Sequence, residues 1–321
     1  MKIVTYRTRS SSARVGIIAG QEIIDLERVS TGPDVLPNEV IAFLRLGDPA
    51  MARAREILSV ALDDPKAFPN ARVQRASAEL LAPIPRPTSM RDGYAFRQHV
   101  EAARRNRGVE MIPEFDLFPV FYFTNHQAVI GPGPLQVMPE HLNRLDYELE
   151  AAIVIGREGR NIKASEADDY VAGYMVMNDW SARALQMEEM KLSLGPAKGK
   201  DFATAIGPYL VTRDELIPYR IAGASGERYD LTMTASLNGK ELSRGNLKDM
   251  TWTFAQIIER ASYGVTLFPG DVIGSGTVGT GCLLELNGSK ITDNLWIKEG
   301  DTVTCAVEAL GELTNTVVKM L

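Results

Sequence analysis

The sequence is poor in basic clusters and contains no long apolar run. Its 35 Lys and Arg residues are outnumbered by 41 Asp and Glu residues, and the net charge of -6 argues against nucleic acid as a partner. No stretch approaches the ~20 uncharged apolar residues that span a membrane, and the first residues lack the charged-then-apolar pattern of a signal peptide. We therefore expect a cytoplasmic protein that binds neither nucleic acid nor a membrane.

Cysteine and histidine are also scarce. The two cysteines, Cys282 and Cys305, form no metal-type pair, and a reducing compartment would keep both as thiols in the core. His126 and His141 lack the spacing of metal ligands. These absences argue against a zinc site and leave oxygen atoms as the candidate ligands of a bound cation.

The apolar residues, 45% of the chain, are sufficient for one large core and a smaller one. Proline clusters at Pro83, Pro85 and Pro87, a stretch with too few amide donors for a helix or a central strand. We place a linker there, which predicts a small N-terminal domain over residues 1–82 and a second domain over residues 83–321. In the first domain we expect short strands at 3–6, 15–19 and 22–25 and a helix over 49–60.

Apolar strand-like runs dominate the second domain. Helical patterns occur over residues 181–192 and 253–262 and after Tyr94. Many strands with few helices, and no regular strand–helix alternation, favour a mainly β or α+β domain with an antiparallel or mixed core. The strand-like runs lie at 120–123, 151–155, 173–177, 209–211, 231–237, 283–286 and 303–310.

The most informative segment is the acidic run over residues 145–150. Alternate residues of a strand share a face, so Asp146, Glu148 and Glu150 would line one side at a spacing of ~7 Å. Such a row repels itself unless it is solvated or shares a cation, and the apolar run at 151–155 indicates that the strand enters the core. The alternative is a solvated outer face of an edge strand.

Two further acids lie where ligands often gather. Asp179 follows the apolar run at 173–177, where it either binds a ligand or caps the helix that begins near Ser181. Asp92 precedes His99 by seven residues, which places both on one face if this stretch is helical. Oxygen ligands of this kind suit a hard cation such as Mg²⁺, Mn²⁺ or Ca²⁺.

These acids lie in five ordered motifs that resemble the fumarylacetoacetate hydrolase family, and the resemblance covers most of the chain after residue 85. It implies a mixed β-roll or sandwich-like catalytic domain, a small N-terminal α+β domain and a homodimer. It also implies Mg²⁺ or Mn²⁺, with Ca²⁺ as an alternative, bound by Asp92, Glu148, Glu150 and Asp179. The motifs are Asp92 to His99, Leu145 to Glu150, Met177 to Arg183, Gly199 to Thr204 and Gly274 to Thr277.

The resemblance further implies three catalytic residues. Glu285 would hold His99 so that this histidine activates water, and Lys200 would stabilise an enolate beside the cation. The alternatives are a buried histidine with satisfied hydrogen bonds, a solvent-facing strand glutamate and a solvated loop lysine. Neither glycine-rich segment predicts a nucleotide site, because no Ser or Thr follows Lys200 and residues 274–281 run into an expected strand.

Substrate contacts are also implied by family position. The sequence departs from the family pattern near Met190 and Lys191, and it does not identify which of Arg104, Arg105 and Arg107 would clasp a distal carboxylate. The implied substrate contacts are Tyr94, Tyr122, Gln186, Thr204 and Thr277.

We therefore expect a metal-dependent hydrolase that cleaves a carbon–carbon bond in a small 1,3-diketo acid, such as an acylpyruvate or a fumarylacetoacetate-like compound. The alternative within the same fold is a decarboxylase, hydratase or isomerase of a 2-keto acid, either oxaloacetate-like or a 2-keto-4-enoate. The pair of His99 and Glu285 favours hydrolysis, because decarboxylation needs no nucleophilic water. A non-enzymatic protein that binds cations for stability would leave His99 and Lys200 unexplained.

Overall fold

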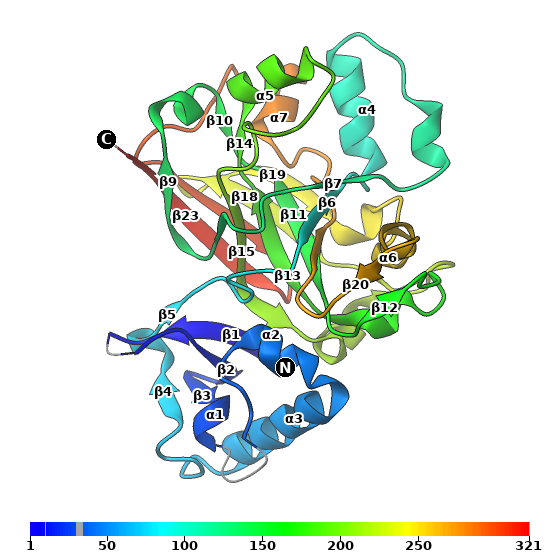
Figure 1. Ribbon diagram of the computed structural model, residues 1–321. Coiled ribbons are helices and arrows are strands. Elements are labelled where there is room, and N and C mark those ends of the chain that lie inside the picture. The colour runs from blue at the N-terminus through cyan, green and yellow to red at the C-terminus, as the bar shows by residue number, and fades with distance from the viewer. Residues whose placement is uncertain (10, 30–34, 321) are drawn as a thin grey trace.

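The computed structural model describes residues 1–9, 11–29 and 35–320 (Figure 1). A 12-stranded mixed sheet runs through both halves of the chain. Ten of the twelve strands follow one path, and the other two, β5 (Glu79–Leu80) and β8 (Val129–Ile130), pair with β1 and β15. In spatial order the main path is β4 (Arg72–Gln74), β3 (Glu22–Asp25), β2 (Arg14–Ala19), β1 (Lys2–Arg7), β15 (Thr204–Val211), β13 (Val171–Asp179), β11 (Leu149–Ile155), β21 (Val272–Gly274), β6 (Met90–Gly93) and β7 (Phe121–Phe123).

A second sheet of five strands packs against β11, β13 and β15. Its strand β18 alternates buried and half-buried side chains, as expected for a strand with one face on the core. Every residue of β11 is buried, because this strand lies between two apolar clusters. In spatial order the second sheet contains β19 (Lys240–Asn246), β18 (Thr232–Leu237), β22 (Thr302–Val307), β23 (Gly311–Lys319) and β9 (Gly133–Val137).

Helices cover the sheets at two places (Figure 1). In the N-terminal half, α3 (Gly47–Asp63) packs on β2 through Ala50, Ala54, Ile57 and Ala61, which share one helix face. At the opposite end of the molecule, α4, α5 and α7 gather above the sheets. The other helices are α1 (Leu26–Val29), α2 (Val40–Arg45), α4 (Arg97–Asn106), α5 (Arg183–Met190), α6 (Phe254–Ser262) and α7 (Leu283–Gly288). Three short strand pairs lie outside the two sheets: β10 (Leu145–Asp146) with β14 (Ser181–Ala182), β12 (Gly159–Arg160) with β20 (Thr266–Leu267), and β16 (Arg220–Ile221) with β17 (Arg228–Tyr229).

Most expected elements are present, and the mainly β fold with a mixed core is confirmed. The strand expected at 283–286 was wrong, because these residues begin α7. The backbone amides of Leu283 and Leu284 donate to the Asp146 carboxylate at 2.7 and 3.0 Å, which satisfies the first turn of this helix. The glycine-rich segment at 274–281 therefore leads into a helix.

Two local expectations about acids also need correction. Asp92 lies in β6 rather than on a helix with His99, which lies in the first turn of α4. The acidic run is not one continuous strand, because β10 ends at Asp146 and β11 begins at Leu149. Asp146 and Glu148 consequently have different surroundings.

The N-terminal strands continue the large sheet of the second half. In the antiparallel pair of β1 and β15, Lys2 lies opposite Val211 and Ile3 lies opposite Leu210. The boundary between residues 82 and 83 stays a prediction, and the two parts share a sheet across it. Among the described residues, no helix has the length and apolar character needed to cross a membrane.

Candidate metal centre

Strands from distant parts of the sequence bring four carboxylates to one end of the large sheet. Because β11 and β13 are antiparallel, the start of β11 lies beside the end of β13, where Asp179 is the last residue. Strand β6 joins the same region through β21, with Asp92 opposite Gly274. The exposed fraction is 3% for Asp92, 7% for Glu148 and 0% for both Glu150 and Asp179. The four acids named from the motifs are therefore buried together.

The carboxylates are close enough to share one cation. Oxygen atoms of Asp92, Glu148 and Glu150 all lie within 4.8 Å of one another. Asp179 joins them through Lys200, whose Nζ donates to Asp179 Oδ2 at 2.8 Å and also donates to Glu148 Oε2. Lys200 is only 4% exposed, so it is not a solvated loop lysine.

Two of the four carboxyl groups, those of Asp92 and Glu150, have too little positive charge beside them to favour ionisation. Burial and the negative charges of Asp92 and Glu148 raise the pKa of Glu150 well above its usual range. Burial and the charge of Asp179 raise the pKa of Asp92 to about 8, and the Asp92 and Glu150 carboxyls hydrogen-bond each other. Buried carboxyl groups whose ionisation is opposed by burial and by one another's charge fit a hard divalent cation, because its positive charge would stabilise their ionised forms.

Glu148 differs because two buried cations hold it ionised. Although burial opposes ionisation, the charges of Lys200 and Arg183 bring the pKa of Glu148 below its usual range. Arg183 donates from Nη2 to Glu148 Oε1 and from Nε to Asp146 Oδ2, both at 2.8 Å. Asp146 is thus held by Arg183 and by the amides of α7, away from the shared-cation position. Arg183 ends one of the family motifs, but its sequence pattern alone indicated no role for it.

The glycine-rich segment after β21 cradles two carboxylates. The Gly276 amide donates to Asp92 Oδ1 at 3.1 Å and to Glu150 Oε2 at 3.0 Å. A Cβ on Gly274 would lie 2.4 Å from Asp92 Oδ1, so a side chain there would push the carboxylate away. Gly276 also has a φ of +77°, a conformation that favours glycine. The Gly276 amide is a backbone contribution that side-chain motifs do not reveal.

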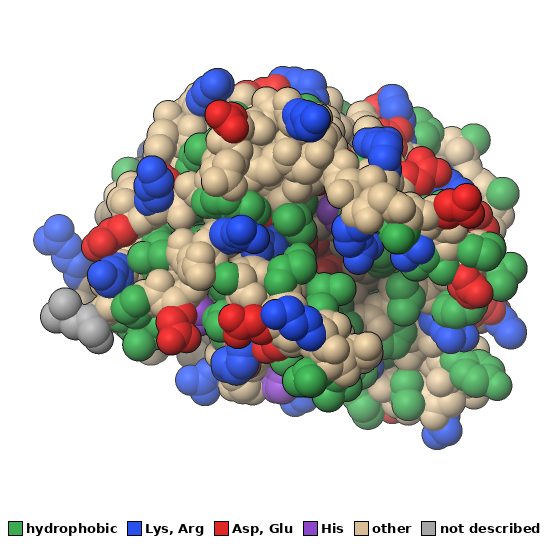
Figure 2. All heavy atoms as spheres, turned by 90° about the horizontal axis from the view of Figure 1, so that it is seen from above, with side chains coloured by type: hydrophobic (Ala, Val, Ile, Leu, Met, Phe, Trp, Pro, Cys, Tyr) green, Lys and Arg blue, Asp and Glu red, His purple; other side chains and the backbone are tan. Residues whose placement is uncertain are grey.

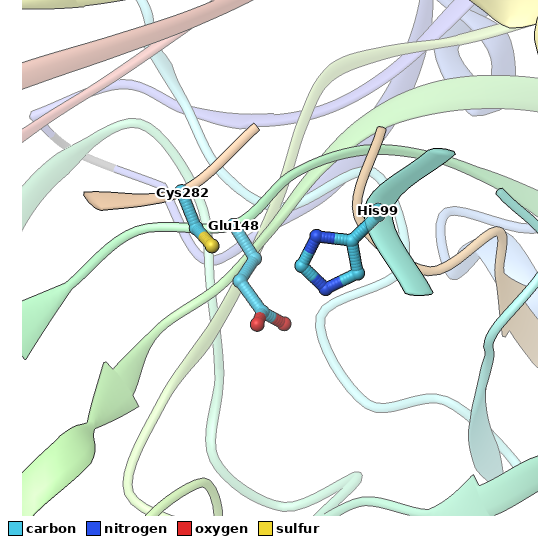
Figure 3. A group of neighbouring side chains, drawn as sticks. All are labelled: His99, Glu148 and Cys282. Atoms are coloured by element: carbon cyan, nitrogen blue, oxygen red, sulfur yellow. The ribbon is translucent and has the colours of Figure 1, made fainter. Parts of the chain in front are cut away.

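A histidine–carboxylate pair borders the same site. His99 Nδ1 lies 2.6 Å from Glu285 Oε2, and Glu285 Oε1 accepts a hydrogen bond from the Thr280 amide at 2.8 Å. Figure 3 shows the other side of the imidazole directed toward the Glu148 carboxylate, with Cys282 on the far side of Glu148. The two residues named from the family motifs are thus brought together, although 186 positions separate them.

The expected substrate contacts lie around these groups. Tyr122 donates to Asp179 Oδ2 at 2.5 Å, and Thr204 donates to Asp179 Oδ1 at 3.4 Å. Thr277 donates to Glu150 at 3.5 Å, and Gln186 accepts from Arg183 at 2.9 Å. Tyr94 packs edge-on against His99, with ring centroids 5.8 Å apart. All five residues border the site, and contact with a substrate stays a prediction for each.

The site opens at the face that carries α4, α5 and α7. Figure 2 shows histidine and acidic side chains at the bottom of a hollow on this face, with Lys and Arg side chains on its rim. Burial raises the pKa of Tyr94 to about 12, against the opposing positive charges of Arg107 and Arg104. The charges of Arg104 and Arg107 therefore act on the Tyr94 hydroxyl.

Comparisons with known proteins agree with this arrangement. A family model described as fumarylacetoacetate hydrolase C-terminal matches residues 88–318. The chain is 30% identical to "Oxaloacetate tautomerase fahd2, mitochondrial" of Xenopus laevis, over 99% of this chain and 90% of that protein. It is also 30% identical to the fumarylacetoacetase of Bos taurus, over 85% of this chain and 80% of that protein.

The fold is shared with solved structures. The fumarylacetoacetate hydrolase of Exiguobacterium antarcticum superposes with a TM-score of 0.73 at 23% identity, and the alignment covers 100% of both chains. The family model spans more than half of the sequence and includes the four candidate ligands, His99, Lys200 and Glu285. The chain therefore belongs to the fumarylacetoacetate hydrolase family.

Proposed function

We propose that this chain is a divalent-cation-dependent hydrolase that cleaves a carbon–carbon bond in a small 1,3-diketo acid. The observation that carries the proposal is the distance of 2.6 Å between His99 Nδ1 and Glu285 Oε2, beside a buried group of carboxylates. This pair can remove a proton from water at the position where a polarised carbonyl would lie. The substrate class is an acylpyruvate or a fumarylacetoacetate-like acid.

The cation ligands in this proposal are Asp92, Glu148, Glu150 and Asp179. Mg²⁺ or Mn²⁺, with Ca²⁺ as an alternative, would polarise the substrate oxygens as a Lewis acid when bound. The raised pKa values of Asp92 and Glu150 support this donor set, because a cation bound between these carboxylates would stabilise their ionised forms.

His99 would act as the general base. With Nδ1–H donating to Glu285, Nε2 is left as the acceptor for a proton from water. The hydroxide adds to the substrate carbonyl, and the bond to the neighbouring carbon breaks with its electron pair moving to that carbon. That fragment leaves as an enolate and takes up a proton, so one water is consumed per bond broken.

Lys200 would stabilise the negative charge that develops on the leaving fragment. Although burial opposes ionisation, Asp179 and Glu148 raise the pKa of Lys200, so it stays a cation. Its ammonium group already bridges two carboxylates at the site, which fixes its position before a substrate binds.

A second candidate is keto–enol tautomerisation of an oxaloacetate-like acid. It is favoured by the Xenopus laevis relative, which matches 99% of this chain and is named an oxaloacetate tautomerase. The same His99 and Lys200 could move a proton between carbon and oxygen without adding water. Decarboxylation, hydration and isomerisation of 2-keto acids belong to this group of alternatives.

The deciding experiment follows the enol absorbance of acylpyruvates, fumarylacetoacetate-like diketo acids and oxaloacetate with Mg²⁺, with Mn²⁺ and with a chelator. Hydrolysis predicts cation-dependent loss of absorbance and recovery of two carbon fragments. Loss of the oxaloacetate enol without fragments would establish the tautomerase, and release of carbon dioxide would establish the decarboxylase.

The matched variants are His99→Ala and Gln98→Ala, since Gln98 is an exposed neighbour on the same helix. We expect His99→Ala to abolish hydrolysis while Mn²⁺ still binds, and Gln98→Ala to keep both properties. If His99→Ala also loses Mn²⁺, the proposed division between base and ligands is wrong.

A further inference from the structure

A sulfur atom lies beside the metal centre and has no part in the proposed hydrolysis. Cys282 is fully buried and immediately precedes α7, while His99 lies on α4 and Glu148 lies just before β11. One ligand atom from each of these three residues lies within 4.8 Å of the other two. Figure 3 shows the Glu148 side chain between Cys282 and His99, with its carboxylate next to the imidazole.

The three donors differ in kind from those of the carboxylate site. A thiolate, an imidazole and a carboxylate suit Zn²⁺ or Cd²⁺, whereas Mg²⁺ and Mn²⁺ prefer oxygen alone. Ligand atoms around a tetrahedral Zn²⁺ lie about 3.5 Å apart, so the three side chains would move toward a common point to close on an ion.

The surroundings of His99 provide a second, independent indication. Histidines that bind metals usually donate their other ring N–H to a carboxylate, which fixes the orientation of the imidazole. Glu285 holds Nδ1 of His99 in this manner at 2.6 Å, and Glu285 is itself fixed by the Thr280 amide. The imidazole is thus preorganised for a cation as well as for a water proton.

The local charge also allows a second cation. Six carboxyl groups lie near two cationic side chains, so the charge of the ionised carboxylates would exceed that of the cations by four. One divalent ion would offset half of that excess. The carboxyl groups are those of Asp92, Asp146, Glu148, Glu150, Asp179 and Glu285, and the cations are Arg183 and Lys200. Arg183 and Lys200 each occupy one oxygen of Glu148, but a carboxylate offers about four lone-pair sites. Glu148 can therefore serve both cation positions.

We propose that His99, Cys282 and Glu148 form a second cation site that selects thiophilic divalent ions such as Zn²⁺ and Cd²⁺. On binding, the Cys282 thiol releases its proton to solvent and the sulfur binds as a thiolate. With Nδ1 held by Glu285, the ion would bind Nε2, which is the nitrogen that accepts a proton from water in the proposed hydrolysis. Thiophilic ions therefore inhibit water activation at a place that Mg²⁺ does not fill.

Binding of Cd²⁺ in excess Mg²⁺ tests the site directly, without any turnover assay. The wild-type chain is expected to bind one Cd²⁺ with a thiolate-to-cadmium absorption band in the ultraviolet. Cys282→Ser should abolish the band and raise the Kd for Cd²⁺ at least tenfold. Cys305→Ser is the matched control, because Cys305 is equally buried but lies in β22 of the second sheet.

Two outcomes would overturn the proposal: Cd²⁺ binding to the wild type without a thiolate band, or a band that survives in Cys282→Ser. If Cys282→Ser does not fold, X-ray absorption of the Zn²⁺-loaded wild type decides instead. One sulfur at about 2.3 Å and one imidazole nitrogen at about 2.0 Å are expected, and a shell of oxygen alone refutes the site. These readouts do not depend on which keto acid the chain acts on.

Discussion

At the scale of single residues, Glu148 and Lys200 show how one buried charge controls several neighbours. Lys200 contacts both Glu148 and Asp179 and its charge opposes the effect of burial on each, so that the pKa of Glu148 is lowered while burial still leaves the pKa of Asp179 raised. Removing such a cation leaves two buried carboxylates closer to neutrality or more dependent on a bound metal. Lys200 therefore has a structural and a chemical contribution that a single activity measurement cannot separate.

Lys200→Met tests the chemical contribution. We expect kcat to fall at least about 100-fold, because a preorganised donor to the developing negative charge is lost. Binding of Mn²⁺, followed by electron paramagnetic resonance, should persist, since the four carboxylates remain. Lys198→Met is the control, because Lys198 is exposed and forms its ion pair with Asp201, outside the carboxylate group. Retention of wild-type kcat in Lys200→Met would refute a part for this lysine in the reaction.

At the scale of elements, the segment between β21 and α7 positions both halves of the site. Its first residues approach Asp92 and Glu150 through backbone, and its end leads into the helix that carries Glu285. The Asp146 carboxylate accepts from the first amides of α7, so the acidic run also fixes this helix. The His99–Glu285 pair and the carboxylate group are therefore held by the same short stretch of chain.

Gly274→Ala tests this close approach. The added Cβ would lie 2.4 Å from Asp92 Oδ1, so we expect the carboxylate to move and the affinity for Mn²⁺ to fall at least tenfold. The control is Gly239→Ala in the turn between β18 and β19, where φ is +80° and no atom lies within 4 Å of the added Cβ. That change should cost about 1 kcal/mol of stability through backbone strain and leave Mn²⁺ binding intact. Equal Mn²⁺ affinities in the two variants would contradict the idea that the close approach of Gly274 positions the Asp92 carboxylate for the cation.

At the scale of the whole molecule, the continuous sheet couples the N-terminal strands to the catalytic region. The pairing of β1 with β15 joins them, and β15 also contributes to the site through Thr204. In the N-terminal part, the buried Asp25 accepts hydrogen bonds from Arg14 at 2.5 and 2.9 Å and from Tyr6 at 2.5 Å. Loss of this hydrogen-bond network should lower the stability of the whole sheet.

Asp25→Asn tests that coupling. Breaking a buried ion pair costs about 3 kcal/mol, so the melting temperature should fall. The three tryptophans, Trp180, Trp252 and Trp296, all lie after residue 82 and report on the catalytic part. If the sheet unfolds as one unit, tryptophan fluorescence detects the full shift. An unchanged fluorescence transition would show that residues 1–82 unfold independently.

The stability difference between wild type and Asp25→Asn should also depend on pH, in a direction set by the pKa of Asp25. Burial opposes ionisation of Asp25, yet hydrogen bonds from Arg14, Tyr6 and the Arg28 amide bring its pKa below the usual value. A lowered pKa stabilises the fold above the unfolded value of ~3.9 and loses this contribution as pH falls through the folded pKa. The difference in unfolding free energy between wild type and Asp25→Asn, measured in urea, should therefore be constant from pH 5 to 7 and shrink below about pH 4.

The order of apolar and acidic residues along the chain predicted the type of fold and the candidate residues of the site. Alternating or continuous apolar runs predicted the strands, because burial on one or both faces leaves that pattern in the residues. Ordered motifs identified Asp92, Glu148, Glu150, Asp179, His99, Lys200 and Glu285 before any contact was known, and these residues do lie together.

How those residues are held depends on contacts between elements that are far apart in the sequence. The run at 283–286 was misread as a strand, since a short apolar run has no period of its own and the Asp146 carboxylate that caps it comes from another strand. Arg183, the Gly276 amide and the Cys282 sulfur gained their significance from partners far away in the sequence. Local patterns record which side chains are buried, whereas the pairing of buried charges depends on which strands become neighbours.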